Sequence, residues 1–435
     1  MRLSAPGLPD RSNYGDLSRL QPGLIATLVR QRHDAARAGV HEDFRIGTPS
    51  GLYSWAVPKF IPEVENLKRL AVQQPVHQWD YKDFQGRLGH GYGKGLVSKL
   101  EESPVVILKN KDGQLMFTRG DHKDAPVYNL IRTKDKNWVL FYGSPNQPLQ
   151  IRRYPKEHFK SVPIEKIPEL IQQGAELSPK IDGAGVLLHL GNNGVRTFGI
   201  RSNKEGSKPE YSSLLPGLLS ASVPSEIRGK VIRGELFGQR AGKSIPANEL
   251  AGLLNATALK AHNKMQSDGT RLLVAALALN DNGTDDYNQQ RLQGVVDKLD
   301  SPYVLSLRRY KGKEAQQLMR DLARGNSKLT HEGVVVHQEG KRPVKSKFQE
   351  DADVVIRSIF KADTDSDNRA GGFEYSLPGS DKVVGRVGTG FDHAMLRDML
   401  NNPSSYIGRT ARIHSQEQYP SGAYRAPGFV AMKAD

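Results

Sequence analysis

The 435-residue sequence contains no cysteine. This absence excludes disulfide bonds, catalysis by a thiolate and zinc held by thiolates, and it fits a cytoplasmic protein, either bacterial or in the cytoplasm of a host if viral. Any metal must therefore be bound by oxygen or imidazole ligands. Long apolar runs are also missing. The run LLVAALAL at residues 272–279 is far shorter than the roughly 20 residues that cross a bilayer, and the N-terminus lacks the apolar segment of a signal peptide, so we expect no membrane partner.

Acidic residues are scarce beside basic ones: 62 Lys and Arg stand against 47 Asp and Glu, for a net charge of +15. Basic and acidic residues number 21 and 15 in residues 1–150, 31 and 20 in residues 151–347, and 10 and 12 in residues 348–435. A pI near 9.6 alone fits a soluble protein as well as a nucleic-acid-binding one. The uneven distribution favours a polyanion bound along the first two segments.

The length predicts about three domains at roughly 150 residues each. Turn-forming residues in GSPNQPLQ at 143–150 and a new strand-rich stretch from residue 349 place the boundaries, giving units 1–150, 151–347 and 348–435. The first unit is mainly β, with strands expected in FRIG, YSWAVP, KRLAVQ, SPVVILKN, QLMFTR and NWVLFYG. The second mixes strands such as GAGVLLHL and KVIRGELFG with helices near 245–266, 284–299 and 312–325, and the third is short-stranded with one helix in DHAMLRDML.

Charged residues lie at the edges of several apolar runs in the second unit. They are Lys180 in KIDG, Glu235 in RGELFG, Glu332 in HEGVVVH, and Lys345 and Lys347 in KSK. Strands could bring these charges into one cleft, a pattern that suits phosphate chemistry. A lysine is a nucleophile only after it loses its proton, which burial or a neighbouring cation favours. KxDG alone is more often a loop with a solvated lysine, so the interpretation depends on the whole series.

In order and spacing, KIDG, IRSNKEG, GELFG, EGVVVH and KSK resemble the nucleotidyltransferase motifs of ATP-dependent DNA ligases. The C-terminal YRAPGFVAMKAD resembles the last motif of that family. The resemblance implies a multidomain α+β protein. Its nucleotidyltransferase domain, with an ATP-grasp-like mixed sheet, would span 151–347, and an OB-fold β-barrel would span 348–435.

The resemblance also implies a role for each matching residue. Lys180 would attack the α-phosphate of ATP and hold AMP as a phosphoramidate. The other expected contacts are Arg201 with the ribose or nick phosphate, Glu235 and Glu332 with Mg²⁺ and the sugar, Lys345 and Lys347 with the α-phosphate, and Arg425, Lys433 and Asp435 with the triphosphate. The expected substrate is nicked duplex DNA bound by a monomer, with ATP and Mg²⁺ as cofactors.

Four positions depart from the family pattern. Gly185 stands where an arginine is usual, Ser178 stands where a glutamate is common and the nearest acid is Glu176, and Lys433 stands where an arginine is common. LLVAALAL lacks the phenylalanine that stacks on adenine, so we interpret it as a core strand. The lysine nucleophile is retained.

The first unit holds a possible metal site. His33, His41 and Asp43 are oxygen and imidazole donors, and His41 and Asp43, two residues apart, share one face of a strand. Two histidines and one aspartate are by themselves more often structural.

The surrounding stretches SWAVPK, RLAV and HQWDY, over residues 30–140, resemble the 3′-phosphoesterase module of bacterial ligase D proteins. The resemblance implies a β-rich phosphoesterase-like domain in which His33, His41 and Asp43 bind Mn²⁺. It gives the task of holding or protonating a 3′-phosphate to Arg45, Arg69, His77 and Tyr81. The two histidines are eight residues apart where the family has six, and residues 1–29 lack the family's upstream aspartate-bearing segment. The domain therefore either processes 3′ ends or clamps duplex DNA as an inactive scaffold.

Two other functions remain open at this point. An RNA ligase would also suit GELFG, although the RxPxF pattern of the tail favours DNA. A nucleic-acid-binding protein without catalysis would show salt-dependent affinity and no lysine adenylate. The retained lysine and glutamates argue against it, because a pure binder has no need for acidic groups that face phosphate.

Overall fold

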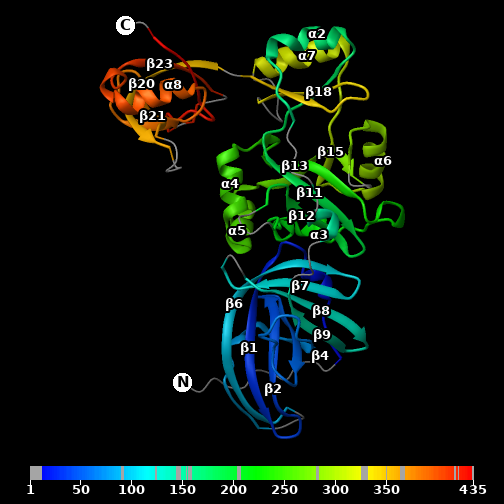
Figure 1. The fold of residues 1–435 in the computed structure, drawn as a ribbon. Helices are drawn as coiled ribbons and strands as arrows, with labels where there is room; N and C mark the ends of the chain where they lie inside the picture. The colour runs from blue at the N-terminus through cyan, green and yellow to red at the C-terminus, as the bar shows by residue number, and fades with distance from the viewer. Residues whose placement is uncertain are drawn as a thin grey trace. The chain divides into compact units, whose positions relative to one another are not determined.

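The structure is a computed structural model of the chain. It describes residues 12–89, 93–122, 125–143, 148–152, 154, 159–202, 207–280, 284–324, 332–348, 350–362, 368–415, 418–419 and 421–433. The chain divides into two compact units: Met1–His158 with Ile181–Arg308, and Phe159–Lys180 with Arg309–Asp435. The predicted multidomain fold, mainly β at the N-terminus and mixed after it, is confirmed (Figure 1).

The first unit begins with a closed antiparallel barrel. Its strand order is β1-β2-β3-β4-β9-β8-β7-β6, and pairing of β1 with β6 closes the ring, while β5 is added beside β6. The strands are β1 (Ile25–Ala35), β2 (Gly39–Thr48), β3 (Gly51–Val57), β4 (Arg69–His77), β5 (Gly86–Leu88), β6 (Gly95–Lys111), β7 (Gln114–Arg119), β8 (Val127–Lys134) and β9 (Asn137–Tyr142). The short helices are η1 (Leu17–Arg19) and η2 (Trp79–Asp83).

Alternation along the barrel strands separates a core from a site. Phe44 and Trp55 point inward and stack at 5.2 Å between ring centroids, and both are fully buried. Their neighbours along the strands, Asp43 and Ser54, therefore point outward. These outward side chains are buried as well, because η2 and the residues after it cover this part of the barrel through Tyr81 and other apolar side chains.

A second sheet of the first unit follows the barrel. Its order is β12-β11-β13-β15-β16, with β14 beside β13 and β17 beside β15. The pairing of β17 with β15 is parallel and the others are antiparallel, so the sheet is mixed, as predicted. The strands are β11 (Ala184–Gly191), β12 (Gly194–Gly199), β13 (Val231–Arg240), β14 (Lys243–Ser244), β15 (Arg271–Asn280), β16 (Asp285–Asp286) and β17 (Val304–Ser306). The helices are α1 (Leu149–Arg152), η4 (Ser212–Leu214), α3 (Pro216–Leu219), η5 (Ser225–Ile227), α4 (Ala247–Asn255), α5 (Ala258–Asp268) and α6 (Gln289–Leu299).

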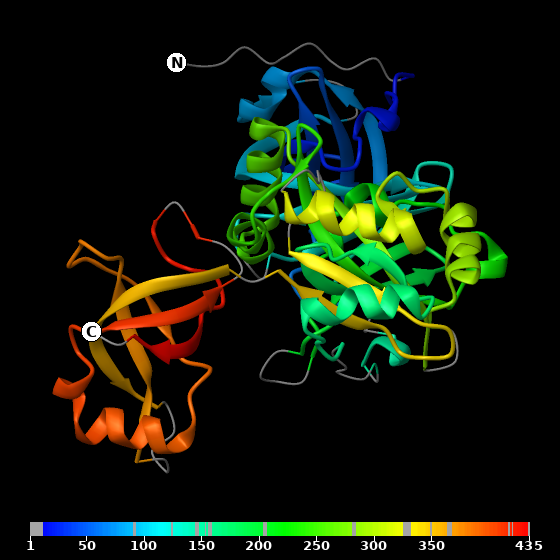
Figure 2. The same cartoon turned by 90° about the horizontal axis from the view of Figure 1, so that it is seen from above.

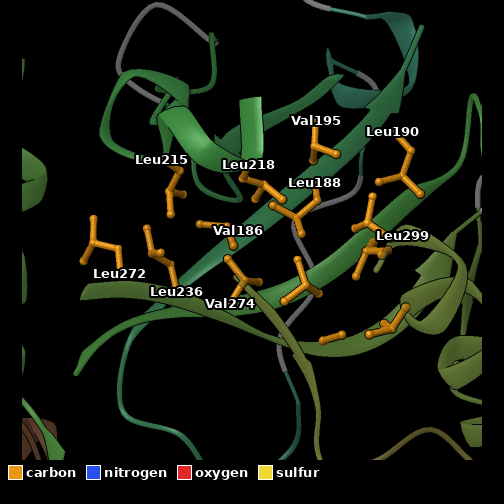
Figure 3. Packing of buried hydrophobic residues seen from close by; sticks show 14 of the residues in the cluster. Val186, Leu188, Leu190, Val195, Leu215, Leu218, Leu236, Leu272, Val274 and Leu299 are labelled. Atoms are coloured by element: carbon orange, nitrogen blue, oxygen red, sulfur yellow. The ribbon is translucent and has the colours of Figure 1, made fainter. Parts of the chain in front are cut away.

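One face of this mixed sheet forms the largest core of the unit. Val186 and Leu188 of β11 and Val274 of β15 are fully buried and meet Leu218 of α3 (Figure 3). Each buried aliphatic side chain of this size contributes about 1.5–3 kcal/mol to folding. LLVAALAL lies within β15, as the core-strand interpretation predicted. This packing holds β11 and β13 in place, and the opposite face of these two strands carries Gly185 and Glu235.

The second unit contains two smaller sheets. The order β10-β18-β19 joins β10 (Glu176–Pro179), β18 (Gly333–His337) and β19 (Val344–Lys347), and α2 (Ile167–Gln172) and α7 (Gly312–Ala323) contribute to the core beneath it, with η3 (Ile164–Lys166) before α2. The order β22-β21-β20-β23-β24 joins β20 (Glu350–Lys361), β21 (Ala370–Ser376), β22 (Val383–Val387), β23 (Thr410–Ser415) and β24 (Gly428–Met432). Helix α8 (His393–Asn401) packs on β20 and β21 (Figure 2), and η6 (Pro403–Ser405) follows it.

Both predicted domain boundaries fall between sheets. The barrel's last strand ends at Tyr142, and the C-terminal sheet begins at Glu350. The three-domain division and the OB-fold assignment of the C-terminal sheet stay predictions. Among the described residues, no helix has the length and apolar character needed to cross a membrane.

Candidate active sites

Lys180 lies directly after β10 in the second unit. Its backbone N–H donates to the carbonyl oxygen of Gly333, at 2.9 Å, continuing the β10–β18 pairing by one residue. Its Nζ lies 2.5 Å from Oε2 of Glu332, and the side chain is 17% exposed. The pairing of β10 with β18 therefore brings together two predicted site residues that are 152 positions apart in the sequence.

Glu332 is shared by two lysines. Its second oxygen, Oε1, lies 2.7 Å from Nζ of Lys347, and its side chain is only 4% exposed. Burial raises the pKa of Glu332, but the charges and hydrogen bonds of Lys180 and Lys347 outweigh burial and hold that pKa below its usual value. One ionised carboxylate thus faces two ammonium groups, which leaves a local excess of positive charge suited to an anion.

Lys345 lies on the same face of the small sheet as Lys347, because the two are separated by one residue of β19. Ser178 of β10 and Lys345 both pair with Val335 of β18, so they stand in one row across the sheet. The opposite face carries the apolar core with Val334. The sheet is therefore two-sided, with its predicted phosphate-binding lysines together on the polar side.

The Ser178 position, where the family commonly has glutamate, forms a neutral pair. Its hydroxyl lies 2.9 Å from Nε2 of His337. Burial, aided by the charge of Arg309, lowers the pKa of His337 to about 3, so this imidazole is neutral. Glu176 instead pairs with Lys311 at 2.8 Å and with Arg309 at 3.5 Å. Neither group supplies a free carboxylate beside Lys180.

Glu235 and Arg201 belong to the first unit. Glu235 lies on β13 opposite Gly185 of β11, and a Cβ added at Gly185 would be 3.9 Å from Oε2 of Glu235 and 3.1 Å from Ile200. A Cβ at Gly183 would meet the carbonyl oxygen of Leu236 at 2.2 Å, so the glycine of KIDG allows this close approach of the strands. Arg201 is exposed just beyond β12.

Lys433 forms an ion pair with an aspartate of the C-terminal sheet. The Nζ of Lys433 pairs with Asp353 of β20, which also lies 3.4 Å from Arg412. Its backbone N–H donates to Thr410 at 2.9 Å. Arg425 lies in the segment before β24, and the predicted triphosphate contact Asp435 lies outside the described residues.

The N-terminal metal candidates meet on the outer face of the barrel. His33 of β1 and His41 of β2 are cross-strand partners, because the β1–β2 hairpin absorbs their eight-residue spacing in its turn. Nδ1 of His33 lies 3.5 Å and Nε2 of His41 lies 3.4 Å from the carboxylate of Asp43. The three ligand atoms lie within 4.8 Å of one another, and all three residues are buried.

The other ring nitrogens fix the tautomers that a metal needs. Nε2 of His33 lies 2.8 Å from the carbonyl oxygen of Gly93, and Nδ1 of His41 lies 3.0 Å from that of Gly39. A ring N–H donating to each carbonyl leaves Nδ1 of His33 and Nε2 of His41 as the metal donors. These two nitrogens and a carboxylate oxygen of Asp43 are the atoms that would hold a divalent metal ion.

Arg45, His77 and Tyr81 adjoin this cluster. Nη2 of Arg45 donates to Asp43 at 3.1 Å, and its guanidinium lies 4.8 Å from the centre of the Tyr81 ring. The pKa of Asp43 is held well below its usual range, because Arg45 and the two histidines outweigh the effect of burial. Burial and the Arg45 charge lower the pKa of His77 to about 3, and burial raises the pKa of Tyr81. His77 and Tyr81 are therefore neutral at pH 7.

Arg69 is not brought to the cluster. It shares its parity on β4 with Ala71 and Gln73, which face the barrel interior, where Ala71 joins the core and Gln73 accepts from Trp138 at 3.2 Å. The cluster lies on the outer face, around Asp43. The phosphate contact predicted for Arg69 therefore has no geometric support, because strand alternation places this residue on the inward-facing side of β4.

Sequence reasoning missed two buried polar residues of this site. Gln31 is fully buried, accepts from Arg45, and donates to the carbonyl oxygens of Tyr81 and Phe84 at 3.2 and 2.8 Å. The hydroxyl of Ser54 lies 3.0 Å from Nδ1 of His77. Gln31 could have been found from its spacing, since it precedes His33 by two residues and so shares its face of β1.

The comparisons with known proteins support the predicted resemblance to ligase D. Residues 31–115 match the family described as the DNA Ligase D 3′-phosphoesterase domain. The chain is 34% identical over 142 residues to a multifunctional non-homologous end joining protein LigD of Pseudomonas aeruginosa, covering 30% of this chain and 16% of that protein. It is 26% identical over 415 residues to the LigD protein of Mycolicibacterium smegmatis, covering 86% of this chain and 49% of that protein.

The matched stretches thus span half or less of these two relatives. Among solved structures, the ligase domain of M. tuberculosis LigD is 17% identical with a TM-score of 0.29, covering 60% of this chain and 90% of that one. A structure of Lig E DNA ligases is 14% identical with a TM-score of 0.44, covering 60% of this chain and 92% of that one.

Proposed function

We propose that the chain is an ATP-dependent DNA ligase that seals 5′-phosphate/3′-hydroxyl nicks through a lysyl-AMP intermediate at Lys180. The observation that carries this proposal is the contact of Lys180 and Lys347 with the single buried carboxylate of Glu332, within motifs that follow the ligase order. The 26% identity to a LigD protein over 86% of this chain supports it, and the name of that relative suggests a role in end-joining repair.

In the first step, Nζ of Lys180 would form a bond to the α-phosphorus of ATP while the bond from that phosphorus to the pyrophosphate oxygen breaks. Lys180 must give up its proton before its amine can attack, and Lys347 is held nearby through the carboxylate of Glu332 that the two lysines share. The polar side of the small sheet, with Lys345 and Lys347, would hold the α-phosphate. A bound Mg²⁺ would neutralise phosphate charge, and Glu332 is a suitable oxygen ligand once one of its lysines moves to phosphate.

Two further transfers would complete the reaction. The AMP would pass from Lys180 to the 5′-phosphate of the nick, and the 3′-hydroxyl would then attack that phosphate and release AMP. The resemblance to DNA ligases also implies nucleotide and phosphate contacts for four further residues. These contacts stay predictions, and the residues are Glu235, Arg201, Arg425 and Lys433. Incubation with nicked DNA and nicked RNA separates a DNA ligase from an RNA ligase. Absence of any adenylate together with tight DNA binding would favour the binding protein.

A second function is favoured by the N-terminal cluster. We propose that His33, His41 and Asp43 bind Mn²⁺ and that Arg45, His77 and Tyr81 receive a 3′-phosphate, so that the barrel leaves a ligatable 3′-hydroxyl. Nε of Arg45 is buried without a hydrogen-bond partner among the described residues, and a phosphate oxygen would satisfy it. Release of phosphate from a 3′-phosphorylated primer-template, dependent on Mn²⁺, tests this proposal. No release with Mn²⁺ would leave the barrel as a clamp.

A further inference from the structure

Parts of β1, β2 and β6 continue past the closed part of the barrel and, together with β5, form what we call the flap: residues 33–35, 39–41, 86–88 and 95–97. Pairing of β3 with β2 ends at Glu42, whereas β2 begins at Gly39. Likewise, β7 pairs with β6 only from Val105 onward, whereas β6 begins at Gly95. Within the described part of the chain, the flap residues therefore pair only with one another, in the order β2-β1-β6-β5, and Figure 1 shows β1 and β2 running to the lowest turn of the barrel.

The two faces of the flap differ in chemistry. On the outer face, the cross-strand row of His41, His33 and Val97 carries the metal cluster under η2. The next row has its side chains on the reverse face and runs across all four strands through Val40, Asp34, Leu96 and Arg87. The metal ligands and this second row are thus one sheet thickness apart.

The reverse face presents two aliphatic side chains to solvent. Val40 is 45% exposed and Leu96 is 44% exposed, and each pairs with Asp34 in the row. Single exposed aliphatic residues are ordinary on protein surfaces, but here two flank one position beside a buried metal cluster. Neither belongs to the two apolar core clusters of the barrel among the described residues.

Basic residues surround this apolar pair. The single acid of the row, Asp34, is neutralised by Nε of Arg32 at 2.8 Å. Arg87 lies in the row itself, and Arg37 in the hairpin turn and Lys94 beside β6 are exposed. The rim of the flap is therefore positive, as expected where a phosphate backbone approaches.

We propose that the flap parts the last base pairs of a duplex DNA end, with Val40 and Leu96 as an apolar wedge. This inference rests on the proposed 3′-end processing. A 3′-phosphate held at the buried cluster on the outer face would belong to one strand, so the partner strand would be led away, and the reverse face of the flap is the adjacent surface. Aliphatic side chains are used in this way to unstack base steps, and basic residues on the rim would hold both backbones.

Fluorescence of 2-aminopurine tests the parting of strands directly. The base is placed opposite the 3′-phosphorylated nucleotide at a blunt duplex end, and the full-length protein is added without Mn²⁺, so that no hydrolysis occurs. We expect the fluorescence to rise on binding, because the base unstacks, and to stay constant when the same base lies ten pairs from the end. The double variant Val40→Ser/Leu96→Ser should lose most of the rise.

A matched control substitutes two aliphatic residues of similar exposure elsewhere on the barrel. Leu70 and Ile131 are 49% and 38% exposed, on β4 and β8. The variant Leu70→Ser/Ile131→Ser should keep the full fluorescence rise. With Mn²⁺ added, the flap variant should lose phosphate release from blunt ends about tenfold more than from unpaired 3′ ends.

Two outcomes would overturn the inference. One is unchanged fluorescence when the wild-type protein binds the end. The other is an equal rise with the flap variant, which would assign this face to a different partner, such as a protein. Failure of the proposed phosphoesterase activity would give a different result. No phosphate would be released from blunt or unpaired 3′ ends, whereas the fluorescence would still report whether the strands part.

Discussion

The pairing of two lysines with Glu332 is the central feature at the residue scale. Breaking a buried ion pair by removing one partner leaves unpaired charge and costs about 3–5 kcal/mol. We therefore expect Glu332→Gln to lower both the free energy of unfolding and the fraction of chains that carry AMP, because Lys180 and Lys347 lose their shared anion. Intact mass after incubation with ATP and Mg²⁺, together with chemical denaturation, measures both.

Glu176→Gln is the control for that prediction. Glu176 lies on the same small sheet and also pairs with two cations, Lys311 and Arg309, but it does not contact Lys180. This variant should keep most of the adenylate. Equal loss in the two variants would mean that adenylation responds to any damage of the sheet rather than to the Lys180 contact.

Metal binding by the barrel is tested at Asp43. Its carboxylate is the one oxygen donor of the cluster, so Asp43→Asn should weaken Mn²⁺ binding by about tenfold to a hundredfold. Isothermal titration calorimetry of the full chain measures this affinity. Asp34→Asn is a matched control, because Asp34 lies on the same hairpin with its side chain on the opposite face. Identical affinities in the two variants would contradict the proposed site.

At the element scale, the turn into β18 depends on Gly333. Its φ is +148°, and a Cβ there would meet the carbonyl oxygen of Ser346 at 2.1 Å. Gly333→Ala should therefore push β18 and β19 apart, move Glu332 away from Lys347, and reduce adenylation by an order of magnitude or more. Gly340→Ala is the control, because Gly340 lies in the connection between the same strands and also has a positive φ, +67°, but has no atom within 4 Å of its Cβ position, so it carries backbone strain without the collision. Equal adenylation by both variants would refute this role.

The same elements show what the sequence could predict. Local periodicity was sufficient for β11, β13 and α7, whose apolar residues follow strand or helix spacing. It could not show that residues 151–347 divide between two sheets, because Leu177 of β10 pairs with Val336 of β18, far along the chain. The strand β1 was also missed. Its outward residues Gln31 and His33 are polar yet buried, so the strand lacks the usual alternation of apolar and polar residues.

The site shows the same limit. The motifs supplied Lys180, Glu332 and Lys347, but only the packed strands show that they share contacts. In the barrel, the spacing of two between His41 and Asp43 was sufficient to place both on one face. Arg69 pairs with the core residue Leu140 and so lies on the inward-facing side of β4, and its phosphate contact stays a prediction.

At the scale of the whole molecule, the positive charge predicts how the proposed ligase would bind DNA. With a net charge of +15, affinity for nicked duplex DNA should fall steeply between about 50 and 200 mM salt, since basic residues release counterions. Arg87 and Lys94 are exposed basic residues of the flap rim. The variants Arg87→Gln and Lys94→Gln should each reduce the slope of the logarithm of the DNA association constant against the logarithm of the salt concentration by about one. Fluorescence anisotropy measures these slopes, and a flat salt dependence would contradict binding through phosphates.

The proposed ligase function depends on one covalent bond, between Lys180 and AMP. The most direct test is the intact mass of the purified full-length protein after incubation with ATP and Mg²⁺, followed by peptide mapping. We predict that the wild-type chain gains one AMP on the peptide that contains Lys180 and that Lys180→Ala gains none. A wild-type chain that never gains this mass, or a Lys180→Ala variant that gains it fully, would contradict the proposed ligase.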